Sequence, residues 1–360
     1  MGNDWNDPAG PGGEAAPLRG LEALTLGDLE ALRLILGGGS VVDWMQLHLD
    51  SPGGPAGLLR TLELEPTQPI DAAYIDHVKR EAIAYLKRNF GFAIPGPVAR
   101  ASLEELLWIA AGKGHRQVCA CTVLKVVHII HHLNGRELLF RLPVSDQDMF
   151  HLVEEKVYRV VGAMLSEGLP ISELIGGRKN LDSTYTKLLS KPGATTTAVY
   201  DKLRFRVVTR TREQIMPVLL HLTERLFPFN YVVPGESTNT IFHFRSFCEA
   251  HPHLRRLVPG LQPTRDDDVG AGDNQFSAPS YRVIHFIADV PVRVPPQVME
   301  LAPPGSDALG PVVFVLVEFQ ILDAESEASN EAGDANHEAY KARQRQAVYS
   351  RLRLGPRGRG

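Results

Sequence analysis

Residues 312–322 read Val-Val-Phe-Val-Leu-Val-Glu-Phe-Gln-Ile-Leu, and this stretch decides the fold class. Val, Ile and Phe dominate it, which is typical of a β-strand buried in a sheet. Because side chains alternate between the two faces of a strand, Glu318 and Gln320 share one face. The other face is wholly apolar and carries Val315, Val317, Phe319 and Ile321. A carboxylate with so many apolar neighbours is costly unless it is paired or functional, which makes Glu318 a candidate general base.

Further strands and helices are predicted around this stretch. Residues 202–209 alternate between apolar and basic side chains, as in a half-buried strand, and residues 281–290 are rich in Val and Ile. Residues 212–226 have the apolar spacing of an amphipathic helix, and residues 325–352 form a polar helical end. The second half is therefore predicted to be an α+β unit, a mixed β-sheet flanked by helices.

The first half has a helical pattern. Apolar residues recur at helical spacing in residues 21–35, 70–89, 118–133 and 147–166. The sequence Ser102-Leu-Glu-Glu105 has the form of a capping box that opens another helix. A helical N-terminal region is thus expected to precede the sheet.

These patterns predict how the chain is divided. We expect a disordered tail at 1–17, a helical domain at 18–170, a sheet domain at 171–352 with insertions near 235–275 and 291–311, and a second disordered tail at 353–360.

Composition excludes several classes of protein. The chain has 360 residues, of which 44% are hydrophobic and 22% charged, so it is neither wholly disordered nor collagen-like. Its net charge of -4 argues against a general binder of polyanions. Three cysteines are too few for a disulfide framework. No membrane span and no signal peptide are recognised, so we expect a cytoplasmic protein without a membrane partner.

Two groups of residues suit the binding of phosphate groups and a metal ion. Lys179, Ser183 and Lys187 are spaced four apart, so on a helix they form one polar stripe that suits a polyphosphate. Asp201 stands where a strand is predicted to begin and can hold Mg²⁺, and Arg206 on that strand can hold phosphate. Each group, taken alone, also fits an ordinary solvated helix face or strand edge.

Two further pairs of residues share a strand face or a helix face. Tyr281 and His285 share a strand face, where the ring can stack on a base and the imidazole can donate to a phosphate. His337 and Lys341 are four apart on the terminal helix and share one of its faces. These pairs also fit a buried tyrosine with a satisfied histidine, and a solvated helix.

The order of the motifs is more specific than any one of them, and it resembles the RelA/SpoT synthetase domain. The resemblance covers residues 171–347 and rests on Lys179-x3-Ser183-x3-Lys187, Asp201-x4-Arg206, Tyr281-x3-His285, Glu318-x-Gln320 and His337-x2-Tyr340-Lys341. That family transfers pyrophosphate from ATP to the 3′-hydroxyl of GDP or GTP, and its fold is related to nucleotidyltransferases. The resemblance therefore implies Mg²⁺ as the cofactor and a role in the stringent response.

The resemblance also implies roles for individual residues. Asp201 and Glu318 are the expected catalytic residues and Mg²⁺ ligands, with Glu318 activating the 3′-hydroxyl. The expected ATP-binding residues are Lys179, Ser183, Lys187 and Arg206. The expected acceptor-binding residues are Tyr281, His285, Gln320, His337 and Lys341.

This sequence departs from the family mostly on the acceptor side. Ser277, Pro279 and Ser280 stand where the family has Lys, Asn and Gly, and Leu322 replaces an Arg. Gly177 stands where the family has an Arg before the first Lys. The acceptor is therefore open between GDP or GTP, an adenine nucleotide and an RNA 3′ end. A catalytically weak nucleotide-binding regulator is the alternative function.

A cluster of metal-ligand residue types in the helical half is not predicted to bind zinc. His128 and His132 share a helix face, but Cys119 and Cys121 point to different sides of that helix, and no Glu follows His128 as in zinc proteases. A core helix is the expected structure there.

Overall fold

The computed structural model describes residues 19–39, 44–49, 53–178, 180–190, 202–261, 280–332 and 337–352. The predicted tails at 1–17 and 353–360 fall outside these residues, so the prediction of disorder stays a prediction.

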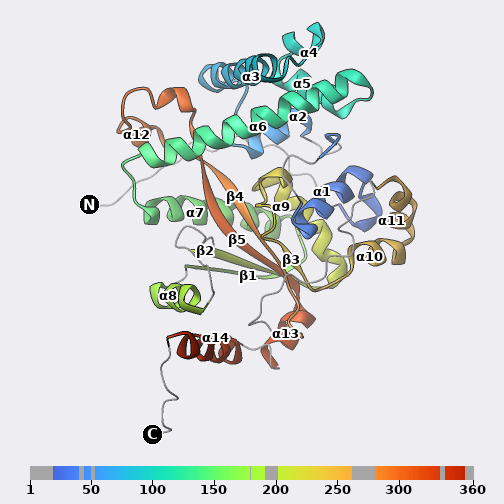
Figure 1. The fold of residues 1–360 in the computed structure, drawn as a ribbon. Coiled ribbons are helices and arrows are strands. Elements are labelled where there is room, and N and C mark those ends of the chain that lie inside the picture. Colours follow the sequence, from blue (N-terminus) through green and yellow to red (C-terminus); the bar gives the residue numbers. More distant parts are fainter. Residues whose placement is uncertain are drawn as a thin grey trace.

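The described strands form one mixed five-stranded sheet in the order β1-β2-β5-β4-β3 (Figure 1). The strands are β1 (Ile171–Arg178), β2 (Leu203–Thr209), β3 (Thr238–Asn239), β4 (Ile284–Arg293) and β5 (Val312–Asp323). β2 and β5 run parallel, whereas the other neighbouring pairs are antiparallel. The predicted fold class, a mixed sheet flanked by helices after a helical N-terminal region, is confirmed.

Helices precede, connect and follow the strands. Those before the sheet are α1 (Leu26–Gly37), α2 (Gly54–Thr61), α3 (Pro69–Phe90), α4 (Gly96–Arg100), α5 (Leu103–Ala111), α6 (His115–Arg141) and α7 (Asp146–Ser166). Those within and after it are α8 (Leu181–Ser190), α9 (Ile215–Arg225), α10 (Phe244–Ala250), α11 (Pro252–Leu257), α12 (Pro296–Met299), α13 (Ala324–Ala332) and α14 (His337–Arg351). Short 3-10 turns are η1 (Leu21–Ala23), η3 (Arg212–Gln214), η4 (Phe229–Tyr231), η5 (Val258–Gly260) and η6 (Asp307–Leu309).

Two strands differ from the sequence-based expectation. β1 was not predicted, and it pairs with β2 as the edge strand of the sheet. β4 begins at Ile284 instead of residue 281, so Tyr281 lies in the loop before it. By contrast, β2 and β5 match their predicted ranges to within one residue at each end.

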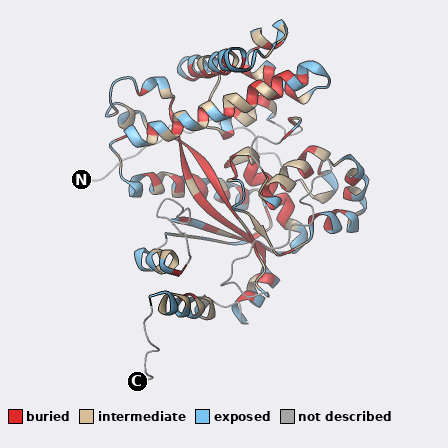
Figure 2. Ribbon diagram, viewed as in Figure 1, coloured by how far each residue is buried: buried red, intermediate tan, exposed pale blue. Residues whose placement is uncertain are grey.

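The structure has two hydrophobic cores, one around the sheet and one within the helical half. β5 contributes side chains to both. One cluster of buried side chains combines α1, α7 and α9 with the apolar face of the sheet. The other fills the space between α2, α3, α5 and α6 and also contains Val312 and Phe314 from the start of β5. Figure 2 shows β4 and β5 buried along their lengths. The sheet is thus anchored at one end by the helical half.

A glycine lets α6 approach β5. A Cβ at Gly135 would lie 2.5 Å from the Phe314 ring and 2.8 Å from the Val312 carbonyl oxygen. α6 also has the length and apolar composition of a helix that could cross a membrane. It packs against α3, α5 and β5, as a core helix does.

Candidate functional site

The register of three adjacent strands gathers polar side chains on one face of the sheet. Gln320 pairs with Arg206 of β2 on one side and with His285 of β4 on the other. Glu318 pairs with Arg204 in the same way. Because paired residues project to the same face, these side chains form a common polar surface.

The opposite face explains why these strands keep that register. It carries Phe205, Phe286 and Phe319. The ring centroids of Phe205 and Phe286 lie 6.1 and 5.4 Å, respectively, from that of Phe319. Phe227, just after α9, adds a ring 5.1 Å from Phe319, and Tyr158 of α7 packs edge-on against Phe205. A slip of one residue would turn the phenylalanines outward and bury the polar set, so the aromatic packing fixes the polar site.

A chain of hydrogen bonds runs across the polar face. Arg206 Nε and Nη2 both donate to Gln320 Oε1 at 3.2 Å. Gln320 Nε2 then donates to Glu318 Oε1 at 2.7 Å. The Gln320 amide thus links the Arg206 guanidinium to the Glu318 carboxylate.

Glu318 is the buried acid at the centre of this network. The residue is only 6% exposed, and His285 Nε2 lies 3.4 Å from its Oε1. The hydrogen bond from the Gln320 amide offsets part of the cost of burying this carboxylate, and the imidazole lies beside it. The predicted pairing of Glu318 with Gln320 on one strand face is confirmed.

Tyr281 joins the same network from the loop before β4. Its hydroxyl shares a hydrogen bond with Arg206, and Arg204 and Glu318 are near enough to act on it electrostatically. Burial is the main cause that raises the pKa of Tyr281, with Glu318 adding to it and the two arginines opposing it. The phenol therefore stays protonated at neutral pH.

An asparagine of α13 holds the backbone beside Tyr281. Asn330 Oδ1 accepts from the Arg282 amide at 2.9 Å, and its Nδ2 donates to the Arg282 carbonyl at 2.7 Å. α13 is itself fixed to the end of β5, because Asp323 accepts from both the amide and the hydroxyl of Ser326. Asp323 is thus a helix N-cap.

Sequence reasoning missed one acid of the site. Glu327 Oε1 on α13 lies 3.6 Å from Arg206 Nη1. The pKa of Glu327 is raised chiefly by burial and then by Glu173, while Arg206 lowers it. Residues 323–338 are rich in acids, which suits the start of a helix near its dipole, and this pattern gave no reason to single out Glu327.

The remaining predicted residues lie on two outer helices or outside the described part. Ser183 and Lys187 are on α8 and Lys341 is on α14, and these helices pack together, with Arg351 Nη1 3.1 Å from the Leu189 carbonyl oxygen. The Ser183 amide donates to Asn180 Oδ1 at 2.8 Å, which starts α8. α8 begins three residues after β1 ends at Arg178. Residues outside the description are Lys179, Asp201 and the side chain of His337.

The histidines of α6 have other partners. His131 Nδ1 lies 2.9 Å from the Tyr74 hydroxyl, and His132 Nε2 lies 2.6 Å from Asp289 Oδ2 on β4. Within the described ranges, no group of three or more His, Cys, Asp or Glu side chains is placed to hold a metal ion.

The geometry defines what the polar face can do chemically. Glu318 can accept a proton, and Arg206 can bind phosphate oxygens. Carboxylate oxygen is the ligand that Mg²⁺ prefers, so Glu318 fits as one ligand within the described part. The structure therefore brings together five of the predicted residues, namely Arg206, Tyr281, His285, Glu318 and Gln320.

Comparisons with known proteins give structural matches only. Neither the protein-family models nor the curated protein sequences contain a match to this chain. Among solved structures, the small alarmone synthetase 1 of Bacillus subtilis is 18% identical, with 56% of this chain and 84% of that chain covered and a TM-score of 0.29. The same synthetase bound to its product pppGpp is 17% identical, with 63% and 90% covered and a TM-score of 0.29.

A GTP pyrophosphokinase family protein from Streptococcus pneumoniae is also similar. It is 13% identical, with 59% of this chain and 90% of that chain covered and a TM-score of 0.26. These proteins are of the class whose motifs the sequence resembles. Such identities and TM-scores establish no activity, so function has to be inferred from this chain's own residues.

Proposed function

We propose that this chain transfers pyrophosphate from ATP to the 3′-hydroxyl of a nucleotide, in a Mg²⁺-dependent reaction like that of (p)ppGpp synthetases. The observation that supports this most is a single cluster of hydrogen bonds and ion pairs. It unites one predicted ATP-binding residue, Arg206, with the predicted base, Glu318, and its acceptor-side neighbours, Tyr281, His285 and Gln320.

The reaction would be an in-line displacement at the β-phosphorus of ATP. The 3′-oxygen forms a bond to that phosphorus, the bond to the oxygen bridging the α- and β-phosphorus atoms breaks, and AMP leaves. Glu318 takes the proton of the 3′-hydroxyl. Positioning and charge stabilisation supply most of the acceleration in phosphoryl chemistry of this kind.

Arg206 would bind the phosphates of ATP. Its guanidinium contacts Gln320, Glu327 and Tyr281, so a triphosphate would compete with Glu327 for it. Lys179 directly follows β1 in the sequence, and Ser183 and Lys187 lie on α8, which begins three residues after β1. Gly177 near the end of β1 pairs with Arg204. These residues would extend the phosphate site away from the acid.

Mg²⁺ would be held by Glu318 and Asp201. Asp201 comes two residues before the start of β2, whose second residue pairs with Glu318. The ion would supply neutralisation of the charge on the transferred phosphates.

The acceptor would bind on the β4 side of the acid. Tyr281 would stack on the base, His285 would donate to an acceptor phosphate, and Gln320, His337 and Lys341 would support it. GDP or GTP is the expected acceptor, with ADP, ATP or an RNA 3′ end as the other candidates. We place the reaction in the cytoplasm.

Release of AMP tests the proposal. The purified chain would be incubated with Mg²⁺, ATP labelled in its γ-phosphate and each acceptor in turn, and AMP and labelled product would be separated. We expect AMP and labelled acceptor in equal amounts, both abolished by EDTA. ATP binding without AMP release for every acceptor would favour the nucleotide-binding regulator instead.

A further inference from the structure

Arg204 is a second arginine on the polar face of the sheet. It stands two residues before Arg206 on β2, and alternate residues of a strand project to the same face. The Arg206 guanidinium is held by Gln320 and Glu327. The Arg204 side chain is exposed, and its guanidinium forms no hydrogen bond or ion pair with any residue that the structure describes. The polar face therefore carries one arginine that protein groups hold and one that is open to a ligand.

The strand register places Arg204 between the end of β1 and the proposed base. Arg204 pairs with Gly177 of β1 on one side and with Glu318 of β5 on the other. Neighbouring strands lie about 4.8 Å apart, so Arg204 is next to both. Residues 179–187, which include the predicted phosphate-binding side chains, directly follow β1 in the sequence. A phosphate chain that is bound by them and reacts beside Glu318 would therefore pass Arg204.

β1 leaves space beside Arg204 and adds no cation to the polar face. A Cβ at Gly177 would meet no atom within 4 Å. The one basic residue of β1, Arg178, is the next residue along the strand and so projects to the other face, where its Nε donates to Glu154 Oε1 of α7 at 2.8 Å. Arg204 thus carries the positive charge at this pair of positions.

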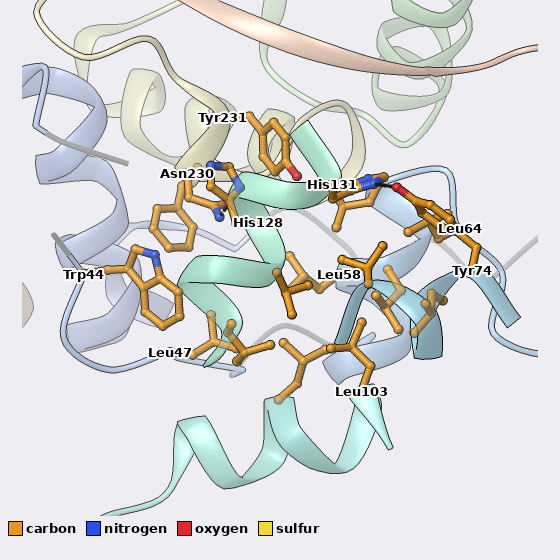
Figure 3. Close-up of a pocket in the computed structure, with 18 residues that line it drawn as sticks. Trp44, Leu47, Leu58, Leu64, Tyr74, Leu103, His128, His131, Asn230 and Tyr231 are labelled. Carbon is orange, nitrogen blue, oxygen red and sulfur yellow. Dashed lines mark hydrogen bonds between the residues drawn. The ribbon is translucent and has the colours of Figure 1, made fainter. Parts of the chain in front are cut away.

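The apolar cavity of the helical half is no alternative site for phosphates. It lies between α2, α3, α5, α6 and η4 (Figure 3). Among the described residues that line it there is no Lys or Arg. Phosphate oxygens lose hydration when they bind and need cationic donors in return, so a polyphosphate fits the sheet face and not this cavity.

We propose that Arg204 binds the phosphate chain of ATP, and that it does so from β2 because β1 has a glycine at the facing position. This inference rests on the proposed function for the identity of its ligand. A guanidinium matches phosphate oxygens with two parallel hydrogen bonds, and the Arg204 guanidinium has no protein partner to give up within the described part of the chain. Arg204 is also near enough to Tyr281 to act on it electrostatically, so phosphates bound there would lie beside the acceptor site.

Binding of α,β-methylene-ATP tests this inference without the reaction, because the methylene group replaces the oxygen at which ATP would be cleaved. Isothermal titration calorimetry with Mg²⁺ would give the Kd for the full chain and for Arg204→Ala. Hydrogen bonds to a charged group are usually worth a factor of about 10 to 150, so the Kd should rise by that factor. The matched control is Arg178→Ala, which removes an arginine that faces away and should leave the Kd unchanged.

Moving the arginine across the strand pair separates a phosphate contact from a structural role. Gly177→Arg, made in the Arg204→Ala background, returns a guanidinium to the same face at a position where a side chain has room. This double variant should bind the analogue at least about fivefold more tightly than Arg204→Ala, since it offers the same donors. Added salt should narrow the difference between wild type and Arg204→Ala, because salt screens a contact between charges.

Three results would overturn the inference. They are an unchanged Kd in Arg204→Ala, an equal loss in Arg178→Ala, and no recovery in a double variant that urea unfolding shows to be folded. If the double variant does not fold, the salt dependence decides, and a difference that salt does not narrow would speak against a phosphate contact.

The same measurements keep this inference apart from the proposed function. Weak binding by Arg204→Ala, together with no AMP release for any acceptor, would support the role of Arg204 and reject the transfer reaction. Unchanged binding by Arg204→Ala, together with AMP release by the wild type, would reject the role of Arg204 alone. A wild-type chain that does not bind the analogue would reject both.

Discussion

At the scale of single residues, a substitution of Glu318 tests the proposed chemistry most directly. Its carboxylate accepts from Gln320 and lies near His285, so an amide in its place would keep the size and lose the basicity. We expect Glu318→Gln to lower the transfer rate by about 10²- to 10⁴-fold, the usual contribution of a general base. Initial rates of AMP release would measure this, and equilibrium dialysis should show ATP binding nearly intact.

Glu325→Gln is the matched control for this change, because it alters an exposed acid on α13 in the same way. It should retain wild-type rates. Full activity of Glu318→Gln would remove Glu318 from the mechanism.

Tyr281 tests the acceptor side. Base stacking on an aromatic ring is worth about 1–3 kcal/mol, so Tyr281→Ala should raise the acceptor KM by about 5- to 150-fold and the ATP KM much less. Tyr281→Phe keeps the ring and loses the hydrogen bond to Arg206, so its acceptor KM should stay near that of the wild type. Steady-state kinetics with GDP and ADP would also show whether base choice is relaxed. An unchanged acceptor KM in Tyr281→Ala would rule out stacking.

Sequence reasoning reached part of this site and not all of it. The two-residue period of a strand placed Glu318 and Gln320 together, and motif order added Arg206, Tyr281 and His285. The sequence could not predict a role for Glu327, because its contact with Arg206 depends on the direction in which α13 leaves β5. The roles of Lys179 and Asp201 stay predictions.

At the scale of elements, β1 shows why local pattern was insufficient. Its sequence contains Gly176 and Gly177, and glycine weakens strand propensity. The structure supplies the reason for Gly176: a Cβ there would collide with the Tyr158 hydroxyl of α7 and lie 2.9 Å from Phe205. This requirement comes from tertiary packing, so sequence spacing does not reveal it. Capping boxes, by contrast, are local, and the predicted one at Ser102 is confirmed at the start of α5.

The two hydrogen bonds by which Asn330 of α13 holds the loop before β4 give a prediction at this scale. Asn330→Ala removes both hydrogen bonds to Arg282 and should cost about 1–3 kcal/mol of folding free energy. Since these bonds fix the segment that carries Tyr281, the acceptor KM should rise while the ATP KM stays nearly constant. Kinetics and urea unfolding would be measured on the same sample. A loss of stability with an unchanged acceptor KM would show that these hydrogen bonds do not position Tyr281.

At the scale of the whole molecule, the two cores are coupled through β5. Phe314 packs in the helical half, with its ring 5.0 Å from that of Tyr231, and lies four residues before Glu318 on the same strand face. His132 and Asp289 add a second link, between α6 and β4. The helical half therefore supports the strands that carry the proposed site, a role that sequence patterns did not predict because it depends on the close approach allowed at Gly135.

Buried histidines make the stability of the whole chain depend on pH. Burial lowers the pKa of His128 and of His131 to about 3 and that of His221 to about 4, from an ordinary value of 6.5. As the pH falls below 6.5, the unfolded chain takes up protons that the folded chain does not, so stability is full above pH 6.5 and is lost toward pH 3–4. Between pH 7 and pH 5, each imidazole should cost about 2 kcal/mol of unfolding free energy. Urea unfolding at the two pH values would measure this change. His131→Phe should shrink the difference by about that amount, and His77→Gln, at a partly exposed position on α3, should not. Equal unfolding free energies at pH 5 and pH 7 in the wild type would mean that these rings are not held neutral in the fold.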